Sequence, residues 1–253
     1  MTLSARPTTL DEIAHFRELY RREMNCQIMG DSLHTRPGWT KSWLLLSDSD
    51  PVGYGTIAIA GTWKDKPTAT EFFILPKHRN RIFDLFETFL AASNPIAIET
   101  QTNAPLLCTM LHTYAKNITA EAILFHDKIT THLASPSNVI FRRSTLADAS
   151  QIASQKLDED AEFVLEQHGQ VVATGGLLYH YTPPYGDIYM AVAQSHRRRG
   201  LGSFIVQELK RTAYELGKIP ACRCNVDNIP SRKTLQKAGF VPCGNRITGT
   251  LPA

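Results

Sequence analysis

Apolar and polar residues alternate along this chain with two spacings, which predict strands and helices. Apolar residues at every second position, or in a short bounded run, predict a strand, whereas recurrence every three to four positions predicts a helix. In the first half, strands are predicted at 39–47, 52–62, 68–75, 96–101 and 120–126. Helices are predicted at 9–24, 79–92 and 104–116, with a loop at 25–37. Thr8 or Thr9 and Asn103 are suited to cap the first and third helices.

The second half repeats these kinds of element after a short polar segment. Residues 130–138 contain Ser135-Pro136-Ser137 and are expected to be a linker. Strands are predicted at 139–143, 161–167, 171–179, 187–193 and 221–225. His168-Gly169 predicts a hairpin turn between two of them. Helices are predicted at 146–157, 201–216 and from 228 onward.

The order of elements is the same in both halves, which indicates an internal duplication. Each half has an early helix, three consecutive strands, a helix, a strand, a helix and a strand. Matching Leu75 to Val192 gives an offset of roughly 117 residues. We therefore expect an α/β (α+β) chain with two tandem domains, 1–134 and 135–253, each built on a mixed, mostly antiparallel sheet flanked by helices.

Composition changes this picture little. The 253 residues are 43% apolar with a net charge of +3, which is too small to indicate a nucleic-acid partner. No apolar run is long enough to span a membrane. Five irregularly spaced cysteines do not form a disulfide framework, and Cys222 with Cys224 lacks a second pair of metal ligands. We expect a cytoplasmic monomer or homodimer with reduced thiols, no metal, and neither nucleic-acid nor membrane partners.

The clearest chemistry lies in Arg197-Arg198-Arg199-Gly200-Leu201-Gly202, between a predicted strand and a predicted helix. Glycines at this place let the backbone turn sharply and approach a ligand closely. The first turn of the helix leaves N–H groups unpaired, and the helix dipole adds partial positive charge there. Three arginines strengthen that field, so the sequence predicts a phosphate-binding loop.

This loop resembles the acetyl-CoA pyrophosphate loop of the GNAT superfamily of N-acetyltransferases, whose signature is Gln/Arg-x-x-Gly-x-Gly/Ala. The residues that follow extend the resemblance over roughly 138–244, with Asn225, Asn228 and Ser231 at the family's spacing and a terminal Gly239-Phe240 pair. The resemblance implies two tandem GNAT-like domains with acetyl-CoA as the acyl donor. The implied donor-binding residues are Met190, Val192, Arg197, Arg198, Arg199, Gly200, Leu201, Gly202, Asn225, Asn228 and Ser231.

The resemblance also implies how the acetyl group moves to an amine, which is by direct attack in a ternary complex. Backbone N–H groups around 190–192 would polarise the thioester carbonyl, because that strand usually bulges and parts from the next one. The pantetheine arm would then lie between 187–193 and 221–225, where Asn225 is suited to bind it.

An ammonium must lose a proton before it can attack, and Asp187 is the first candidate base. It begins the strand at, or one residue from, the place where many relatives carry a glutamate. His180 and Glu162 are the reserves, and a plain turn residue is an equal reading of Asp187. Relatives often have a tyrosine four residues before the terminal Gly-Phe to protonate the thiolate, but Leu235 stands there. We assign no acid, although Tyr179, Tyr181, Tyr189 and water are alternatives.

The first half departs from the loop signature. Under the same offset Asn80, Phe83 and Leu85 stand opposite Arg197, Gly200 and Gly202. Side chains at these places block close backbone approach to a pyrophosphate, so no acyl transfer is expected there. The first half would shape a substrate cleft, support the fold or keep a vestigial donor site. Gln101 and Asn103 lie near the places of Asn225 and Asp227.

Two classes of function remain open for the whole chain. The first is an acetyl-CoA-dependent N-acetyltransferase that acts on a primary amine of a small molecule or peptide. The second is a non-catalytic acyl-CoA-binding or regulatory protein, which the leucine at position 235 favours. The sequence does not name the acceptor.

Overall fold

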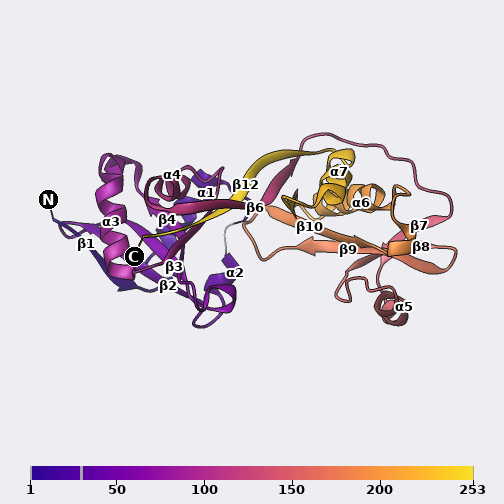
Figure 1. Cartoon of the computed structure of the whole chain (residues 1–253), viewed down its shortest axis with the longest axis horizontal. Coiled ribbons are helices and arrows are strands. Elements are labelled where there is room, and N and C mark those ends of the chain that lie inside the picture. The colour runs from indigo at the N-terminus through magenta and orange to yellow at the C-terminus, as the bar shows by residue number, and fades with distance from the viewer. Residues whose placement is uncertain (1, 29–30, 253) are drawn as a thin grey trace. The chain divides into compact units, whose positions relative to one another are not determined.

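The computed structural model describes residues 2–28 and 31–252, and the chain divides into two compact units (Figure 1). The first unit comprises Met1–Ala122 with Gly244–Ala253, and the second comprises Ile123–Cys243. This division differs from the expected ranges 1–134 and 135–253, because the boundaries fall inside the two strands β6 (Lys116–Asp127) and β12 (Phe240–Thr250). The last ten residues of the chain therefore belong to the first unit.

The first unit has a mostly antiparallel sheet in the order β1-β2-β3-β4-β5-β12, followed by the start of β6. Its strands are β1 (Leu3–Thr8), β2 (Thr40–Ser47), β3 (Asp50–Ala58), β4 (Thr68–Ile74) and β5 (Ala97–Gln101). Its helices are α1 (Ala14–Met24), α2 (Asp31–His34), α3 (Ile82–Ser93) and α4 (Pro105–Tyr114), with 3-10 turns η1 (Gly61–Trp63) and η2 (Pro76–Arg81).

Alternation along the strands directs apolar side chains to both faces of this sheet. Side chains of α3 and α4, including Phe86 and Met110, pack with Phe72 on one face. Side chains of α1, including Phe16 and Tyr20, pack with Phe73 on the other. Burial of both faces makes the unit a three-layer structure.

Several local predictions for the first half are corrected. The edge strand β1 was not expected, and α1 starts at Ala14 without a side-chain cap from Thr8 or Thr9. Asn103 does not cap α4. In the predicted loop 25–37, Asp31–His34 is helical, while positions 29 and 30 lie outside the described residues.

The second unit has the sheet order β11-β10-β9-β8-β7, with the end of β6 beside β11. Its strands are β7 (Val139–Arg143), β8 (Phe163–Gln167), β9 (Gln170–Leu178), β10 (Tyr185–Val192) and β11 (Ile219–Asn225). Its helices are α5 (Ala149–Ser154), α6 (Leu201–Glu215) and α7 (Ile229–Lys237), with 3-10 turns η3 (Leu146–Asp148) and η4 (Gln194–His196). Figure 1 shows α6 and α7 on one side of β9 and β10 and α5 on the other.

Most predicted elements of the second half are found close to their expected places. Strand β7 has the predicted bounds, and His168-Gly169 forms the β8–β9 turn with both φ angles positive, at 52° and 76°. The exception is the predicted helix 146–157, which is only the turn η3 followed by the six-residue α5. Helix α6 packs Phe204, Ile205 and Leu209 onto the sheet, so it is the main cover of that face.

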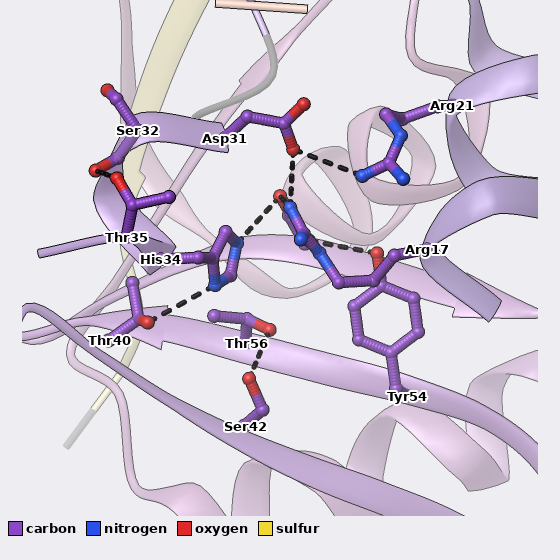
Figure 2. Close-up of polar contacts among 11 residues, drawn as sticks. Arg17, Arg21, Asp31, Ser32, His34, Thr35, Thr40, Ser42, Tyr54 and Thr56 are labelled. Atoms are coloured by element: carbon purple, nitrogen blue, oxygen red, sulfur yellow. Dashed lines mark hydrogen bonds and ion pairs between the residues drawn. The ribbon is translucent and has the colours of Figure 1, made fainter. Parts of the chain in front are cut away.

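The first unit contains a buried carboxylate, Glu71 of β4, whose hydrogen-bonding capacity is filled. Figure 2 shows the side chains of its partners Arg17, His34 and Tyr54. Its Oε1 lies 3.0 Å from His34 Nε2, and its Oε2 accepts from the Tyr54 hydroxyl at 2.8 Å and from Arg17 Nε at 3.4 Å. Burial by itself would raise the pKa of Glu71, but the charge and hydrogen bonds of these partners lower it to about 2. Asp31 extends the network through Arg17 and Arg21.

Backbone geometry fixes how the two halves correspond. Leu75 and Ala193 follow β4 and β10 with nearly the same angles, φ −54° and ψ 137° against φ −52° and ψ 136°. Each also donates its N–H to the preceding strand. Leu75 therefore corresponds to Ala193, one residue beyond the predicted match to Val192. Gly200 then falls opposite Ile82 and Gly202 opposite Asp84, so Phe83 and Leu85 are not the counterparts.

Candidate active site

Strands β10 and β11 part from each other in the middle of the second unit. They pair in parallel from Tyr185↔Ile219 to Ile188↔Cys222. Beyond that point β10 continues to Val192 while paired with β9, and β11 continues to Asn225. Within the part of the chain that the structure describes, no further β10–β11 pair follows. The result is a fork that opens beyond Ile188 and Cys222, whereas the resemblance implied a gap along the whole of 187–193 and 221–225.

The backbone of β10 presents polar groups to this fork. The N–H group of Ala193 donates to Val172 O at 3.0 Å, so it points toward β9. By strand alternation the N–H group of Ala191 points toward β9 as well. Met190 and Val192 therefore turn their N–H groups the other way, toward the side of β11. The register of β10 with β9 is continuous from Asp187 to Val192, so the expected bulge in this strand is absent.

The segment after β10 forms a loop with two left-handed residues. Arg198 has φ 63° and Gly200 has φ 83°, and Gly200 immediately precedes α6. Residues in this conformation alternate with right-handed ones in concave, anion-binding arrangements of backbone N–H groups. Leu201 and Gly202 form the first turn of α6, whose free N–H groups and dipole favour an anion.

The loop is open where a phosphate would approach. A Cβ built on Gly200 meets no atom within 4 Å, and its positive φ is one that side-chain-bearing residues rarely adopt. Gly202 has a different reason to be glycine, because its Cβ would lie 3.1 Å from Thr234 Cγ2, a packing contact with α7. The sequence motif thus combines one glycine needed for the turn with one needed for helix packing.

Arginine charge surrounds the loop without acidic partners. Arg197 donates Nε to Val192 O at 3.1 Å, which ties the loop to the end of β10. Among the described residues, no carboxylate forms an ion pair with Arg197, Arg198 or Arg199. All three are exposed. A free cationic cluster beside unpaired backbone N–H groups fits a pyrophosphate, and Gly200 leaves room for it.

The predicted residues after β11 have mixed geometry. Asn225 ends β11, is exposed, and accepts the Asp227 N–H at its Oδ1 over 2.9 Å. Its side-chain NH₂ group thus remains available to a ligand. Asn228 Oδ1 caps α7 by accepting the Ser231 N–H at 3.1 Å. Asn228 and Ser231 therefore fix the start of α7, which is a structural task.

Asp187 lies one residue before the strands part. Its side chain is buried, and its Oδ2 lies 2.7 Å from Arg223 Nη1 of β11. Its Oδ1 is also buried and has no hydrogen-bond partner among the described residues. Burial raises the pKa of Asp187 to about 6, although the charge of Arg223 lowers it. A carboxylate with such a pKa accepts and releases protons near neutral pH.

The reserve residues are less well placed. His180 is exposed and stacks on Tyr181 with ring centroids 4.2 Å apart. Glu162 borders an open pocket of about 550 Å³ beside β7 and α5, together with Glu159, Asp160 and Arg143. The Tyr189 hydroxyl donates to Asp160 O at 3.3 Å at the same pocket. Leu235 is buried in the core under α6, so the position offers no proton donor.

Arg223 is a residue of this candidate site that sequence reasoning missed. It is the one charged residue in the predicted strand 221–225, and the other side chains there are small, apolar or polar. A charge within an otherwise neutral strand often has a partner on the neighbouring strand. That signal was available in the sequence, but its partner was not.

This part of the second unit thus combines a fork that exposes backbone N–H groups, a glycine-bearing loop suited to an anion, and a buried carboxylate. Comparison with protein families gives the class of protein, since residues 127–240 match the acetyltransferase (GNAT) family. Residues 127–240 therefore form a GNAT domain, which supports acyl-CoA-dependent acetyl transfer in general. A search of the curated proteins found no match to the chain.

Solved structures extend the likeness to the whole chain. A GNAT-family acetyltransferase from Colwellia psychrerythraea is 15% identical with a TM-score of 0.76, and the match covers 100% of both chains. A tandem GNAT protein from the clavulanic acid biosynthesis pathway is 13% identical with a TM-score of 0.62, again over 100% of both. A GCN5-related N-acetyltransferase from Sphaerobacter thermophilus gives 12% and 0.56, over 99% of this chain and 96% of that one. At such identities the likeness concerns the fold, which is that of tandem GNAT-like domains.

The described residues include no helix that combines the length and apolar character needed to cross a membrane.

Proposed function

We propose that the chain is an acetyl-CoA-dependent N-acetyltransferase that acetylates a primary amine of a small molecule or peptide in a ternary complex. The observation that carries this proposal is the fork between β10 and β11. At one end lies the open arginine loop, which forms no ion pair with a carboxylate among the described residues, and at the other end lies Asp187. Bound acetyl-CoA supplies an acetyl thioester whose carbonyl carbon bonds to the neutral amine as the C–S bond breaks and the CoA thiol is released.

The donor-binding residues have distinct tasks in this proposal. Backbone N–H groups of Arg198 through Gly202 and the arginine side chains hold the pyrophosphate. The NH₂ group of Asn225 binds the pantetheine amides. The N–H groups of Met190 and Val192 face the fork and stabilise negative charge on the carbonyl oxygen, as an oxyanion hole does.

Asp187 is proposed as the general base. Its unpartnered Oδ1 can accept a proton from the acceptor ammonium, and its pKa of about 6 keeps it ionised at pH 7. No residue is assigned as the acid for the thiolate, because Leu235 is a core residue.

Leu235 is also the observation that favours the second candidate, a non-catalytic acyl-CoA-binding protein. The two functions differ in turnover and share donor binding. Purified protein is to be incubated with acetyl-CoA and putrescine, spermidine, lysine or tyramine. Cationic amines are chosen because Glu159, Asp160 and Glu162 line the open pocket.

Release of CoA thiol with a matching mass increase on an amine supports the enzyme, and binding without turnover supports the second candidate. Gly200→Val provides the control for donor binding, since a branched side chain cannot readily adopt φ 83°. At a hundredfold excess over its Kd, acetyl-CoA should stabilise the wild type by about 2.7 kcal/mol. Equal stabilisation of Gly200→Val would refute the loop assignment.

A further inference from the structure

The two oxygens of Asp187 have unequal surroundings. Oδ2 is held 2.7 Å from Arg223 Nη1, whereas Oδ1 is buried and has no partner in the described part of the chain. A buried carboxylate oxygen without a donor destabilises the fold. Such an atom in a native protein points to a ligand that supplies the missing donor.

Arg223 is held in place from a second direction. Its Nη2 donates to the Tyr181 hydroxyl, and its guanidinium carbon lies 4.5 Å from the centre of the Tyr181 ring. Tyr181 is in turn stacked on His180. A planar guanidinium that is both stacked and hydrogen-bonded has little rotational freedom, so it can hold a carboxylate in one orientation.

The position of Arg223 in the strand explains why it reaches Asp187. Asp187 pairs with Ala221, and Arg223 is two residues further along β11, so both side chains lie on the same face of the sheet. Cys222 carries the last β10–β11 pair, which makes Arg223 the first residue of β11 beyond it. The guanidinium is therefore anchored where the two strands part.

From this geometry we infer that Arg223 is a positioning residue for the proposed base, holding Asp187 by Oδ2 so that Oδ1 is presented to the acceptor amine. This inference rests on the proposed function, because it assumes that Asp187 accepts the proton. The proton moves from the acceptor ammonium to Oδ1, and the amine lone pair then forms the new C–N bond as the C–S bond of acetyl-CoA breaks. A second proton leaves the nitrogen, and the thiolate departs as the CoA thiol. The fixed positive charge of Arg223 also favours a neutral amine over an ammonium beside it.

The electrostatic surroundings of Asp187 are simple enough to test. Arg223 is the charged group that acts on Asp187, and the buried thiol of Cys222 beside it is neutral, because burial raises the pKa of Cys222 well above its usual value. Loss of the Arg223 charge must therefore raise the pH at which Asp187 ionises. Arg223→Lys keeps the positive charge but not the planar guanidinium group, so it separates this effect on the pKa from the effect on orientation.

The experiment compares wild type with Arg223→Met, Arg223→Lys and Tyr181→Phe. Rates of acetyl transfer to the best amine of the panel are measured against pH, and acetyl-CoA binding is measured by thermal shift. In Arg223→Met the acidic limb of kcat/KM should move to higher pH, and kcat above the limb should fall at least about tenfold. Arg223→Lys should restore the limb but not kcat, and Tyr181→Phe should lower kcat less. Donor binding should be unchanged in all three.

Two results would overturn the inference. One is an Arg223→Met variant that is folded and has the wild-type limb and kcat, and the other is an Arg223→Lys variant with full kcat. If no amine reacts, the ¹³C titration of the Asp187 carboxyl replaces the rates, and an unchanged midpoint in Arg223→Met is the negative result. Failure of the proposed function is seen separately in the wild type, which then either is not stabilised by acetyl-CoA or binds it without acetylating any amine.

Discussion

The two units have the same strand-to-helix passage, and only the second keeps it open for an anion. Arg79 and Arg197 occupy corresponding places, and each donates Nε to the last carbonyl of its strand, Ile74 O at 2.9 Å and Val192 O at 3.1 Å. In the first unit, however, Glu23 neutralises Arg79 with a bidentate ion pair. The second unit has no such acid beside Arg197 among its described residues.

Backbone conformation separates the passages further. Arg198 and Gly200 have positive φ before α6, whereas η2 runs directly into α3 and Arg81 at its end has φ −116°. The counterpart of Gly202 is Asp84, whose charge would repel a phosphate. The shared arginine contact therefore belongs to the fold, and what remains specific to the second unit is the left-handed turn with unpaired charge.

The buried carboxylates give a second contrast. Glu71 has His34, Arg17 and Tyr54 as partners and a pKa of about 2, whereas Asp187 has one ion pair, a bare oxygen and a pKa of about 6. Burial acts on both in the same direction, and the number of donors decides the outcome. A carboxylate whose hydrogen-bonding positions are all filled stabilises the structure, and one with an unfilled position is available for chemistry.

The largest expected effect comes from neutralising Asp187, the carboxylate with an unfilled hydrogen-bonding position. Asp187→Asn should lower the rate of acetyl transfer by about 10²–10⁴-fold, the usual contribution of a general base. The matched variant Glu71→Gln should keep the wild-type rate at temperatures where it is folded. Steady-state release of CoA thiol measures both, and equal losses would remove the functional distinction between the two groups.

Stability should show the opposite ranking. Glu71→Gln leaves Arg17 without its buried partner, and breaking such a pair usually destabilises a protein by about 3–5 kcal/mol. Because the pKa of Glu71 is lowered, its contribution is present above about pH 4.5 and is lost as the pH falls towards about 2. Urea unfolding of variant and wild type at several pH values measures this, and a pH-independent difference would argue against the ion pair.

Asp187 should have a pH-linked effect of the reverse sign. Its pKa rises from 3.8 to about 6 on folding, so the native state binds the proton more tightly than the unfolded state. The free energy of unfolding of wild type relative to Asp187→Asn should therefore fall between about pH 4 and pH 6, by up to about 3 kcal/mol. A flat difference across this range would mean that Asp187 has an ordinary pKa.

The smallest effect is expected from the loop arginines. Arg198→Gln and Arg199→Gln should each weaken acetyl-CoA binding by about 0.5–1 kcal/mol, roughly two- to fivefold, and reduce its salt dependence. Arg79→Gln in the first unit is the matched control and should leave the Kd unchanged. Calorimetric titration at low and high salt gives these values. An effect of Arg79→Gln on the Kd would place donor binding in the wrong unit.

Pattern reasoning was most reliable where one residue type has one physical use. The strand–glycine–helix passage at 197–202 was predicted from glycines placed between a strand and a helix, and Gly200 has the positive φ, 83°, that suits glycine. Edge strand β1 was missed because Leu3 is its one large apolar residue, and pairing with β2 alone makes it a strand. The correspondence of the halves was misjudged by one residue, because matching apolar runs cannot resolve a single-residue slip.

Side-chain partnerships were not predictable in the same way. Gln101 ends β5 as Asn225 ends β11, but its amide is clamped to the backbone of Ile28, which leaves no free group for a ligand. Asp187 was a candidate from its place in the sequence, and its burial and bare oxygen were not visible there. Contacts between residues far apart in the chain depend on packing, which local patterns do not encode.

The sequence by itself determined the duplicated order of elements, the glycine turn before α6 and the family of the second half, because these depend on spacing and backbone preference within short segments. Tertiary structure decided which strands part, which charges are paired and where each unit ends. The reason is physical, since pKa, burial and ion pairing are set by groups brought together from distant positions. Arg223 shows this most clearly, because its ion-pair partner is the Asp187 carboxylate on the neighbouring strand.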